Sequence, residues 1–256
     1  MPGRFTLYLG PLLAGLLLSA VTGHAADSNA APAAMAKSHA PKVLGLLTND
    51  QVDPSRLLPA PPADGSARQK AELAEVQRIY RTRTPDRLAQ AQWDNDHEDL
   101  TLYNATLGPA FDLARLPATA KLLALVDNDQ AIAAGRAKDF FKRTRPWALD
   151  PTIRACDYKP NAKTQTSYPS GHATLGYSIG YVLAALMPDK AQTILARADD
   201  YAYSREICGD HFASDTEASH VLGTAVAVQI LAKPDIAPLF AAARTELHAA
   251  RLTEAP

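Results

Sequence analysis

The chain has 256 residues, of which 47% are hydrophobic and 21% are charged, which is typical of a globular protein with a sizeable core. This balance excludes disorder, collagen and a coiled coil as descriptions of the whole chain. A formal net charge of −1 argues against a nucleic-acid polymer as partner, because such a partner requires a basic surplus. The two cysteines are too few for a disulfide-built scaffold, although they allow one bridge.

Residues 1–25 have the pattern of a secretory signal peptide. Arg4 precedes an apolar run from Leu7 to Val21, and Gly23-His24-Ala25 is a small-x-small cleavage pattern. We expect cleavage after Ala25; the alternative, a retained anchor, is disfavoured because the apolar run is short for a bilayer. The predicted location is therefore periplasmic or secreted, in an oxidising compartment, with no stable membrane insertion after cleavage.

Residues 26–65 form a Pro- and Ala-rich N-terminal arm. Pro54, Pro59, Pro61 and Pro62 prevent a long helix in this segment. We expect an extended arm that lies on the domain, partly disordered at its start, and we interpret it as a tether.

Residues 66–256 have apolar side chains at spacings of three and four, which predicts a single all-α helical bundle. No alternating run of strand length is present. The predicted helices are 67–81, 85–106, 118–125, 129–145, 171–187, 188–207, 215–232 and 236–252. Ser214 and Glu217 fit a capping box as N-cap and N3, and Pro188 fits the first position of a helix.

The first cluster with chemical potential contains Lys138 and Arg145. The two are seven residues apart, so two helical turns place both cations on one helix face. Pro146 cannot continue the helix, which holds Arg145 near its C-terminal end. Two such cations suit an oxyanion with several oxygens; the alternative is a solvated basic face.

The second and third clusters add a helix N-terminus and two histidines. Ser170 and Gly171 open an apolar helix and offer a hydroxyl and backbone N–H groups to an anion, and His172 follows in the first turn. In the third cluster, Arg205 is a second bidentate phosphate donor. There Asp215 is placed to accept from one ring nitrogen of His211 and leave the other as base or nucleophile.

Together the clusters predict a site that binds a phosphate-like group and attacks it through histidine. The sequence contains no His-x-x-x-His, Cys-x-x-Cys or Asp-rich loop, so we expect neither a metal nor another cofactor.

The order Lys-x6-Arg-Pro, Pro-Ser-Gly-His and Ser-Arg-x5-His-x3-Asp resembles the signature of the type 2 phosphatidic acid phosphatase superfamily, which also contains the vanadium-dependent haloperoxidases. Within it, the chain is similar to the secreted class A bacterial non-specific acid phosphatases. The resemblance covers most of the mature chain, most firmly residues 118–232.

The resemblance implies a role for each matching residue. His211 is expected to form a phosphohistidine, Asp215 to orient His211, and His172 to protonate the leaving oxygen. The phosphoryl oxygens are expected to be held by Lys138, Arg145, Ser170, Gly171 and Arg205. The implied substrates are small phosphomonoesters such as nucleotides, with phosphotransfer as a side activity and vanadate as a phosphate-mimicking inhibitor.

Three residues differ from the family pattern: Glu206, Asp210 and Phe212. Carboxylates beside the nucleophile weaken binding of dianions or shift the pH optimum. Cys156 and Cys208 are expected to form a disulfide, with two buried thiols as the alternative. A haloperoxidase and a catalytically silent exported phosphate-binding protein stay as alternative functions, and the sequence is compatible with a homo-oligomer.

Overall fold

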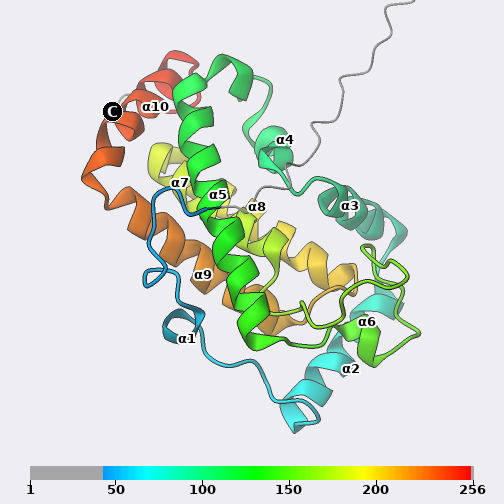
Figure 1. The fold of residues 1–256 in the computed structure, drawn as a ribbon. Helices are drawn as coiled ribbons and strands as arrows, with labels where there is room; N and C mark the ends of the chain where they lie inside the picture. The colour runs from blue at the N-terminus through cyan, green and yellow to red at the C-terminus, as the bar shows by residue number, and fades with distance from the viewer. Residues whose placement is uncertain (1–42, 255–256) are drawn as a thin grey trace, which may run out of the picture. The chain divides into compact units, whose positions relative to one another are not determined.

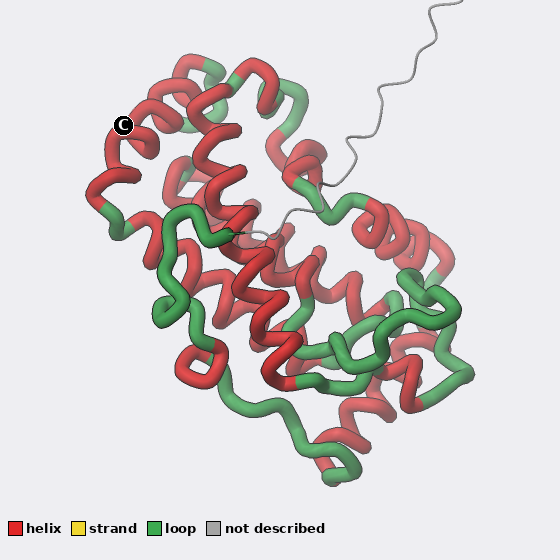
Figure 2. Tube along the Cα trace, viewed as in Figure 1, coloured by secondary structure: helices red, strands yellow, loops and turns green. Residues whose placement is uncertain are grey.

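The computed structural model describes residues 43–254. The predicted signal peptide and the first part of the arm lie outside this range. The predicted all-α class is confirmed, because the described residues contain helices and loops and no strand (Figure 2).

The α-helices follow one another along the chain in Figure 1. They are α1 (Pro54–Leu57), α2 (Ala67–Thr82), α3 (Pro85–Asp96), α4 (Asn104–Leu107), α5 (Pro117–Phe141), α6 (Pro146–Leu149), α7 (Gly171–Leu186), α8 (Ala191–Ile207), α9 (Ala213–Leu231) and α10 (Ala237–Ala249). Short 3-10 helices are η1 (Leu100–Tyr103), η2 (Leu113–Arg115), η3 (Pro188–Lys190) and η4 (Pro234–Ile236).

Helix α7 is the centre of the bundle and packs against α5, α8 and α9 (Figure 1). It is apolar on all sides, and most of its residues are buried, as expected of a core helix. Gly223 allows α9 to approach closely, because a Cβ atom there would lie 2.9 Å from the Ser178 nitrogen and the Thr174 oxygen of α7. This contact sets the spacing between two of the helices that carry predicted site residues.

The described part of the arm, residues 43–65, packs on the helices. Leu47, Val52 and Leu58 are buried in the main core, and the Tyr168 hydroxyl donates to the Pro59 carbonyl oxygen over 2.7 Å. Apart from the single turn of α1, the described arm consists of turns and extended stretches, and a long helix is absent from it, as its prolines predict. These residues contribute to the core, which goes beyond the role of a tether.

A break predicted between residues 125 and 129 is wrong, because α5 is continuous there. Asp129, the predicted start of a separate helix, lies inside α5 and is buried. Its carboxylate accepts from the backbone nitrogens of Gly45, Leu46 and Leu47 at 2.6, 2.9 and 2.7 Å. The polar side chain in the middle of the helix therefore has its partners in the arm.

Two other predicted helix ends also differ from the structure. The helix predicted for 85–106 ends at Asp96, and the Asp99 side chain then starts η1 by accepting from the Thr101 nitrogen. The N-cap assigned to Ser214 is wrong, since Ser214 lies inside α9. The helix begins after Phe212, whose backbone nitrogen donates to the Asp215 carboxylate.

Between residues 43 and 254, no single helix combines the length and apolarity needed to cross a membrane. Only Ala213–Leu231 together with Pro234–Ala249, which are bent by 78° relative to each other, reach that length and composition.

Candidate active site

The three predicted clusters meet where the N-terminal ends of α7 and α9 approach the C-terminal ends of α5 and α8. The Ser170 backbone nitrogen donates to the Asp215 carbonyl oxygen over 3.4 Å, and the Ser167 nitrogen donates to the Arg143 oxygen over 3.0 Å. These contacts join segments that are about 20 to 50 residues apart in sequence. Helix N-termini carry partial positive charge, so this end of the bundle suits an anion.

His211 and Asp215 form a buried pair at the start of α9. The His211 Nδ1 atom lies 3.3 Å from Asp215 Oδ2, and both side chains are almost fully excluded from solvent. The same carboxylate accepts from the Ser167 hydroxyl at 2.6 Å and from the Phe212 backbone nitrogen at 2.9 Å. Asp215 is thus fixed in orientation and keeps the proton of His211 on Nδ1, which leaves Nε2 without a proton.

Arg143 holds this pair from behind and was not among the predicted site residues. Its Nη1 donates to Asp215 Oδ1 over 2.6 Å, its Nη2 donates to Glu72 over 2.6 Å, and its guanidinium lies 4.2 Å from the Phe212 ring centroid. Burial raises the pKa of Asp215, and the Arg143 charge opposes that rise. The sequence gives no local signal for Arg143, because its partners are about 70 residues away in both directions.

Lys138 and Arg145 come together, although not on one helix face as predicted. Helix α5 ends at Phe141, Lys142 turns the chain with a φ of 49°, and Arg145 follows in extended conformation. Thr166 bridges the two cations: its carbonyl oxygen accepts from Lys138 Nζ at 2.6 Å, and its hydroxyl accepts from Arg145 Nε at 3.1 Å. Burial, reinforced by the Arg145 charge, lowers the pKa of Lys138 to about 7.

Arg205 is fully buried and completes the group of cations. Its Nη1 donates to the Asn95 side-chain oxygen and its Nη2 to Asp210 Oδ2, both over 3.0 Å. The second oxygen of Asp210 lies 3.5 Å from Arg145 Nη1. Asp210, one of the three residues that depart from the family pattern, therefore contacts two of the predicted phosphate ligands.

Ser170, Gly171 and His172 form the N-terminus of α7, as predicted. The Ser170 hydroxyl caps the helix by accepting from the Ala173 nitrogen over 3.3 Å. A Cβ atom on Gly171 would lie 3.0 Å from Glu98 Oε1, so glycine leaves space for this close neighbour.

His172 is 9% exposed and contacts two oxygen acceptors that were not predicted from the sequence. Its Nε2 lies 3.0 Å from the Asn95 carbonyl oxygen, and its Nδ1 lies 3.4 Å from Glu98 Oε1. Because a carbonyl oxygen only accepts, Nε2 carries a proton. Burial, followed by the charge of Arg205, lowers the pKa of His172 well below its ordinary value, and burial followed by Arg145 and Lys138 does the same for His211.

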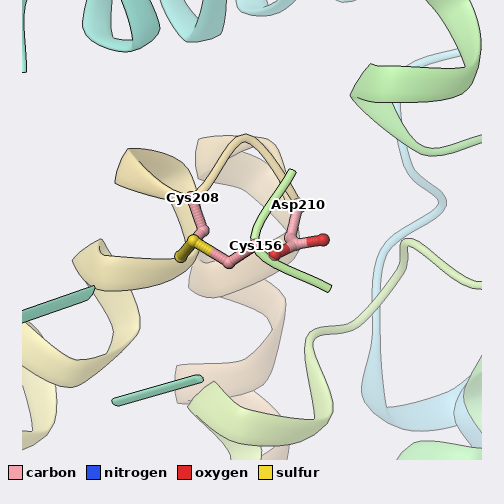
Figure 3. A group of neighbouring side chains, drawn as sticks. All are labelled: Cys156, Cys208 and Asp210. Atoms are coloured by element: carbon pink, nitrogen blue, oxygen red, sulfur yellow. A yellow bond between two sulfur atoms is a disulfide. The ribbon is translucent and has the colours of Figure 1, made fainter. Parts of the chain in front are cut away.

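The expected disulfide joins Cys156 to Cys208, with a Cα–Cα distance of 5.1 Å (Figure 3). Within residues 43–254, the one group of three potential metal-ligand side chains comprises these two cysteines and Asp210. Both sulfur atoms are consumed by the bridge, so they are not available as thiolate ligands. The bridge instead fixes the turn at Gly209, whose φ of 73° favours glycine, directly before Asp210 and His211.

A small cavity of about 180 Å³ borders Arg145. Trp147 and Thr166 line it together with three residues of the loop before α7, which are Asp157, Ala162 and Lys163.

Known proteins match this chain over the segments that form the site. The PAP2 superfamily pattern matches residues 119–235. An acid phosphatase from Zymomonas mobilis subsp. mobilis is 32% identical over 203 residues, which cover 78% of this chain and 77% of the relative. Non-specific acid phosphatases from Providencia stuartii and Salmonella typhi are 28% and 26% identical; the matches cover 76% and 97% of this chain and 81% and 94% of the relatives. This chain therefore belongs to the PAP2 superfamily and is related over most of its length to bacterial acid phosphatases.

Proposed function

We propose that this protein is an exported acid phosphatase that hydrolyses small organic phosphomonoesters, such as nucleotides, through a phosphohistidine at His211. The observation that carries this proposal is the buried His211–Asp215 pair, held by Arg143 and placed beside three cations and a helix N-terminus. The names of the relatives favour the same reaction. The signal-peptide pattern of residues 1–25 supports export to the periplasm or the medium.

In the first step, Nε2 of neutral His211 attacks the phosphorus atom, and the bond between phosphorus and the leaving oxygen breaks. The positive charge that develops on the imidazole is stabilised by Asp215, which accepts from Nδ1. Lys138, Arg145 and Arg205 hold the phosphoryl oxygens together with the Ser170 hydroxyl and the Gly171 N–H. Positioning and charge stabilisation are the main contributions of a protein to phosphoryl transfer.

His172 supplies the proton that the leaving oxygen takes up. In the second step, His172 accepts a proton from water, the water oxygen attacks phosphorus, and the bond to Nε2 of His211 breaks. An alcohol in place of water gives phosphotransfer to that alcohol. The same group thus acts as acid and then as base.

The pKa directions explain how the two histidines differ in protonation. Both pKa values are lowered by burial and by nearby cations, so His211 is neutral and ready to attack in the free enzyme. A bound phosphate brings negative charge and raises the pKa of His172, which favours its acid form. Activity is expected to fall at higher pH as His172 loses its proton, and at very low pH as His211 gains one.

The test is hydrolysis of p-nitrophenyl phosphate from about pH 4 to pH 8, with EDTA present. His211→Ala is expected to lose at least about 10³-fold in kcat, because it lacks the nucleophile. His248→Ala is the matched control, since His248 is exposed on α10. Rapid acid or alkaline quenching with a ³²P-labelled substrate is expected to trap a base-stable phosphoprotein in the wild type and none in His211→Ala.

Three results would contradict parts of this proposal. We propose that the reaction needs no metal or other cofactor. Full inhibition by EDTA that is reversed by added metal would contradict this. Wild-type inactivity together with tight phosphate binding would indicate a silent phosphate-binding protein. Bromide oxidation by the vanadate-loaded protein with peroxide would indicate the haloperoxidase; the phosphatase proposal expects vanadate only to inhibit.

A further inference from the structure

The cations predicted to bind phosphate already contact an internal anion, Asp210. Its carboxylate is completely buried, with Oδ2 accepting from Arg205 at 3.0 Å and Oδ1 lying 3.5 Å from Arg145 Nη1. The Asp210 carbonyl oxygen also accepts from Arg145 at 3.3 Å, so backbone and side chain of one residue contact the same guanidinium. Oδ1 has no hydrogen-bond partner among the described residues.

This carboxylate changes the charge that a phosphoryl group meets. Arg143 is neutralised by Asp215 and Glu72, which leaves Lys138, Arg145 and Arg205 as the cations of the site. Asp210 removes one of these three positive charges. A phosphomonoester is a dianion above about pH 6. A bound dianion would therefore lie beside a buried carboxylate, and both anions would contact Arg145 and Arg205.

We propose that Asp210 sets the protonation state in which this site binds phosphate: the dianion binds together with one proton, which Asp210 and the phosphoryl group share. This inference rests on the proposed function and refines it, because it makes the monoanionic phosphomonoester the preferred substrate form. Asp210 is thereby a specificity-determining residue. The proton moves between two oxygen atoms and no other bond changes on binding.

The groups that face Asp210 come from three segments of the chain. They are Arg145 before α6, Arg205 from α8, and Asp157 from the loop before α7. The carboxylate charge of Asp157 opposes the ionisation of Asp210, whereas the backbone N–H of Asp157 favours it. The two arginines stay charged throughout the accessible pH range. Burial raises the pKa of Asp210, which is the direction needed for it to take up a proton beside a second anion.

The experiment measures binding of inorganic phosphate by calorimetry at about pH 5 and pH 8, in two buffers that differ in ionisation enthalpy. Asp210→Asn keeps the shape of the side chain and removes its charge. Glu206→Gln is the matched control, because Glu206 is a buried carboxylate whose side chain hydrogen-bonds Thr216, whereas the ion pairs of Arg145 and Arg205 are with Asp210. All variants are also made in the His211→Ala background, so that binding is measured independently of catalysis.

Two unit charges about 5 Å apart at an effective dielectric constant near 20 change affinity by up to roughly 300-fold, and screening by water reduces this. At pH 5, Asp210→Asn is therefore expected to bind phosphate about as tightly as the wild type does. At pH 8, it is expected to bind phosphate 10- to 100-fold more tightly than the wild type. The wild type is expected to take up about one proton more per phosphate at pH 8 than Asp210→Asn. Glu206→Gln is expected to follow the wild type; titration of Lys138 affects all variants alike and cancels in the comparison.

Weaker binding of Asp210→Asn at both pH values would overturn the inference, because it would show that Asp210 only positions the arginines. Equal binding and equal proton uptake would overturn it as well. If Asp210→Asn does not fold, Asp210→Ala and the proton uptake of the wild type alone provide the test. Failure of the proposed function is distinguishable, since it appears as absent hydrolysis, whereas this inference is read from phosphate binding.

Discussion

Replacement of Arg143 by methionine tests whether the site depends on the ion pairs that Arg143 forms behind His211, the proposed nucleophile. The Arg143 side chain is 1% exposed, and its partners Asp215 and Glu72 are 0% and 14% exposed. Removal of one partner of a buried pair leaves an uncompensated charge and costs about 3–5 kcal/mol. For a domain of this size, that cost corresponds to a fall of roughly 6–20 °C in Tm.

The same change is expected to reduce kcat by about 10²-fold or more, because Asp215 loses the group that fixes its Oδ1 and favours its charged form. Without Arg143 the pKa of Asp215 rises further. A carboxyl group whose pKa is raised on folding destabilises the folded state most where it is ionised, so the destabilisation is expected to be smaller at about pH 4.5 than at about pH 7.5.

Thermal unfolding at both pH values and hydrolysis of p-nitrophenyl phosphate measure these effects. Arg78→Met is the control, since Arg78 and Glu75 form a surface pair with both side chains about half exposed, and it is expected to leave the Tm almost unchanged. A Tm within 2 °C of the wild type, together with a kcat reduced by less than about threefold, would refute the reasoning.

Three further predictions concern stability. Cys156→Ser/Cys208→Ser opens a bridge that spans 52 residues and is expected to cost about 4 kcal/mol, measured by urea unfolding; no change in the midpoint would contradict it. Burial raises the pKa of Glu206 to about 7, so its stabilisation is complete below about pH 4.5 and is lost as pH rises through 7. Glu206→Gln is accordingly expected to add up to about 3 kcal/mol at pH 8 and little at pH 4.5, and equal effects at both would count against it. Asp129→Ala removes the acceptor of three arm nitrogens and is expected to speed amide exchange of residues 45–47, whereas unchanged protection would show that other contacts hold the arm.

Much of the fold could be predicted from the sequence because most helices follow local apolar spacing. The predictions for α2, α7 and α9 agree with the structure within about two residues at each end. The errors occur where a polar residue has a distant partner. Asp129, the predicted start of a separate helix, lies inside α5, and its carboxylate accepts from the backbone nitrogens of residues 45–47, more than 80 residues away in the sequence.

The candidate site shows the same division between local and distant signals. Linked motifs identified the residues that the structure brings together, including His211 and Asp215. Arg143, Asn95 and Glu98 were missed because each acts through contacts with segments far away in the chain. The Ser214 cap was wrong since Asp215, one residue later, accepts from the Phe212 nitrogen.

The backbone contacts between Ser170 and Asp215 and between Ser167 and Arg143 have a consequence for how such a protein can diversify. The ends of the motifs are tied directly to one another. Within the loop between α6 and Ser167, Cys156 and Thr166 also support the site, so it is the stretch 158–163 that does not have to hold the reacting groups in place. Three residues of that loop line the cavity beside Arg145. Changes in residues 158–163, which include Ala162 and Lys163, can therefore alter which leaving group fits while the chemical step is retained, and this stretch is the place to randomise when new substrates are sought.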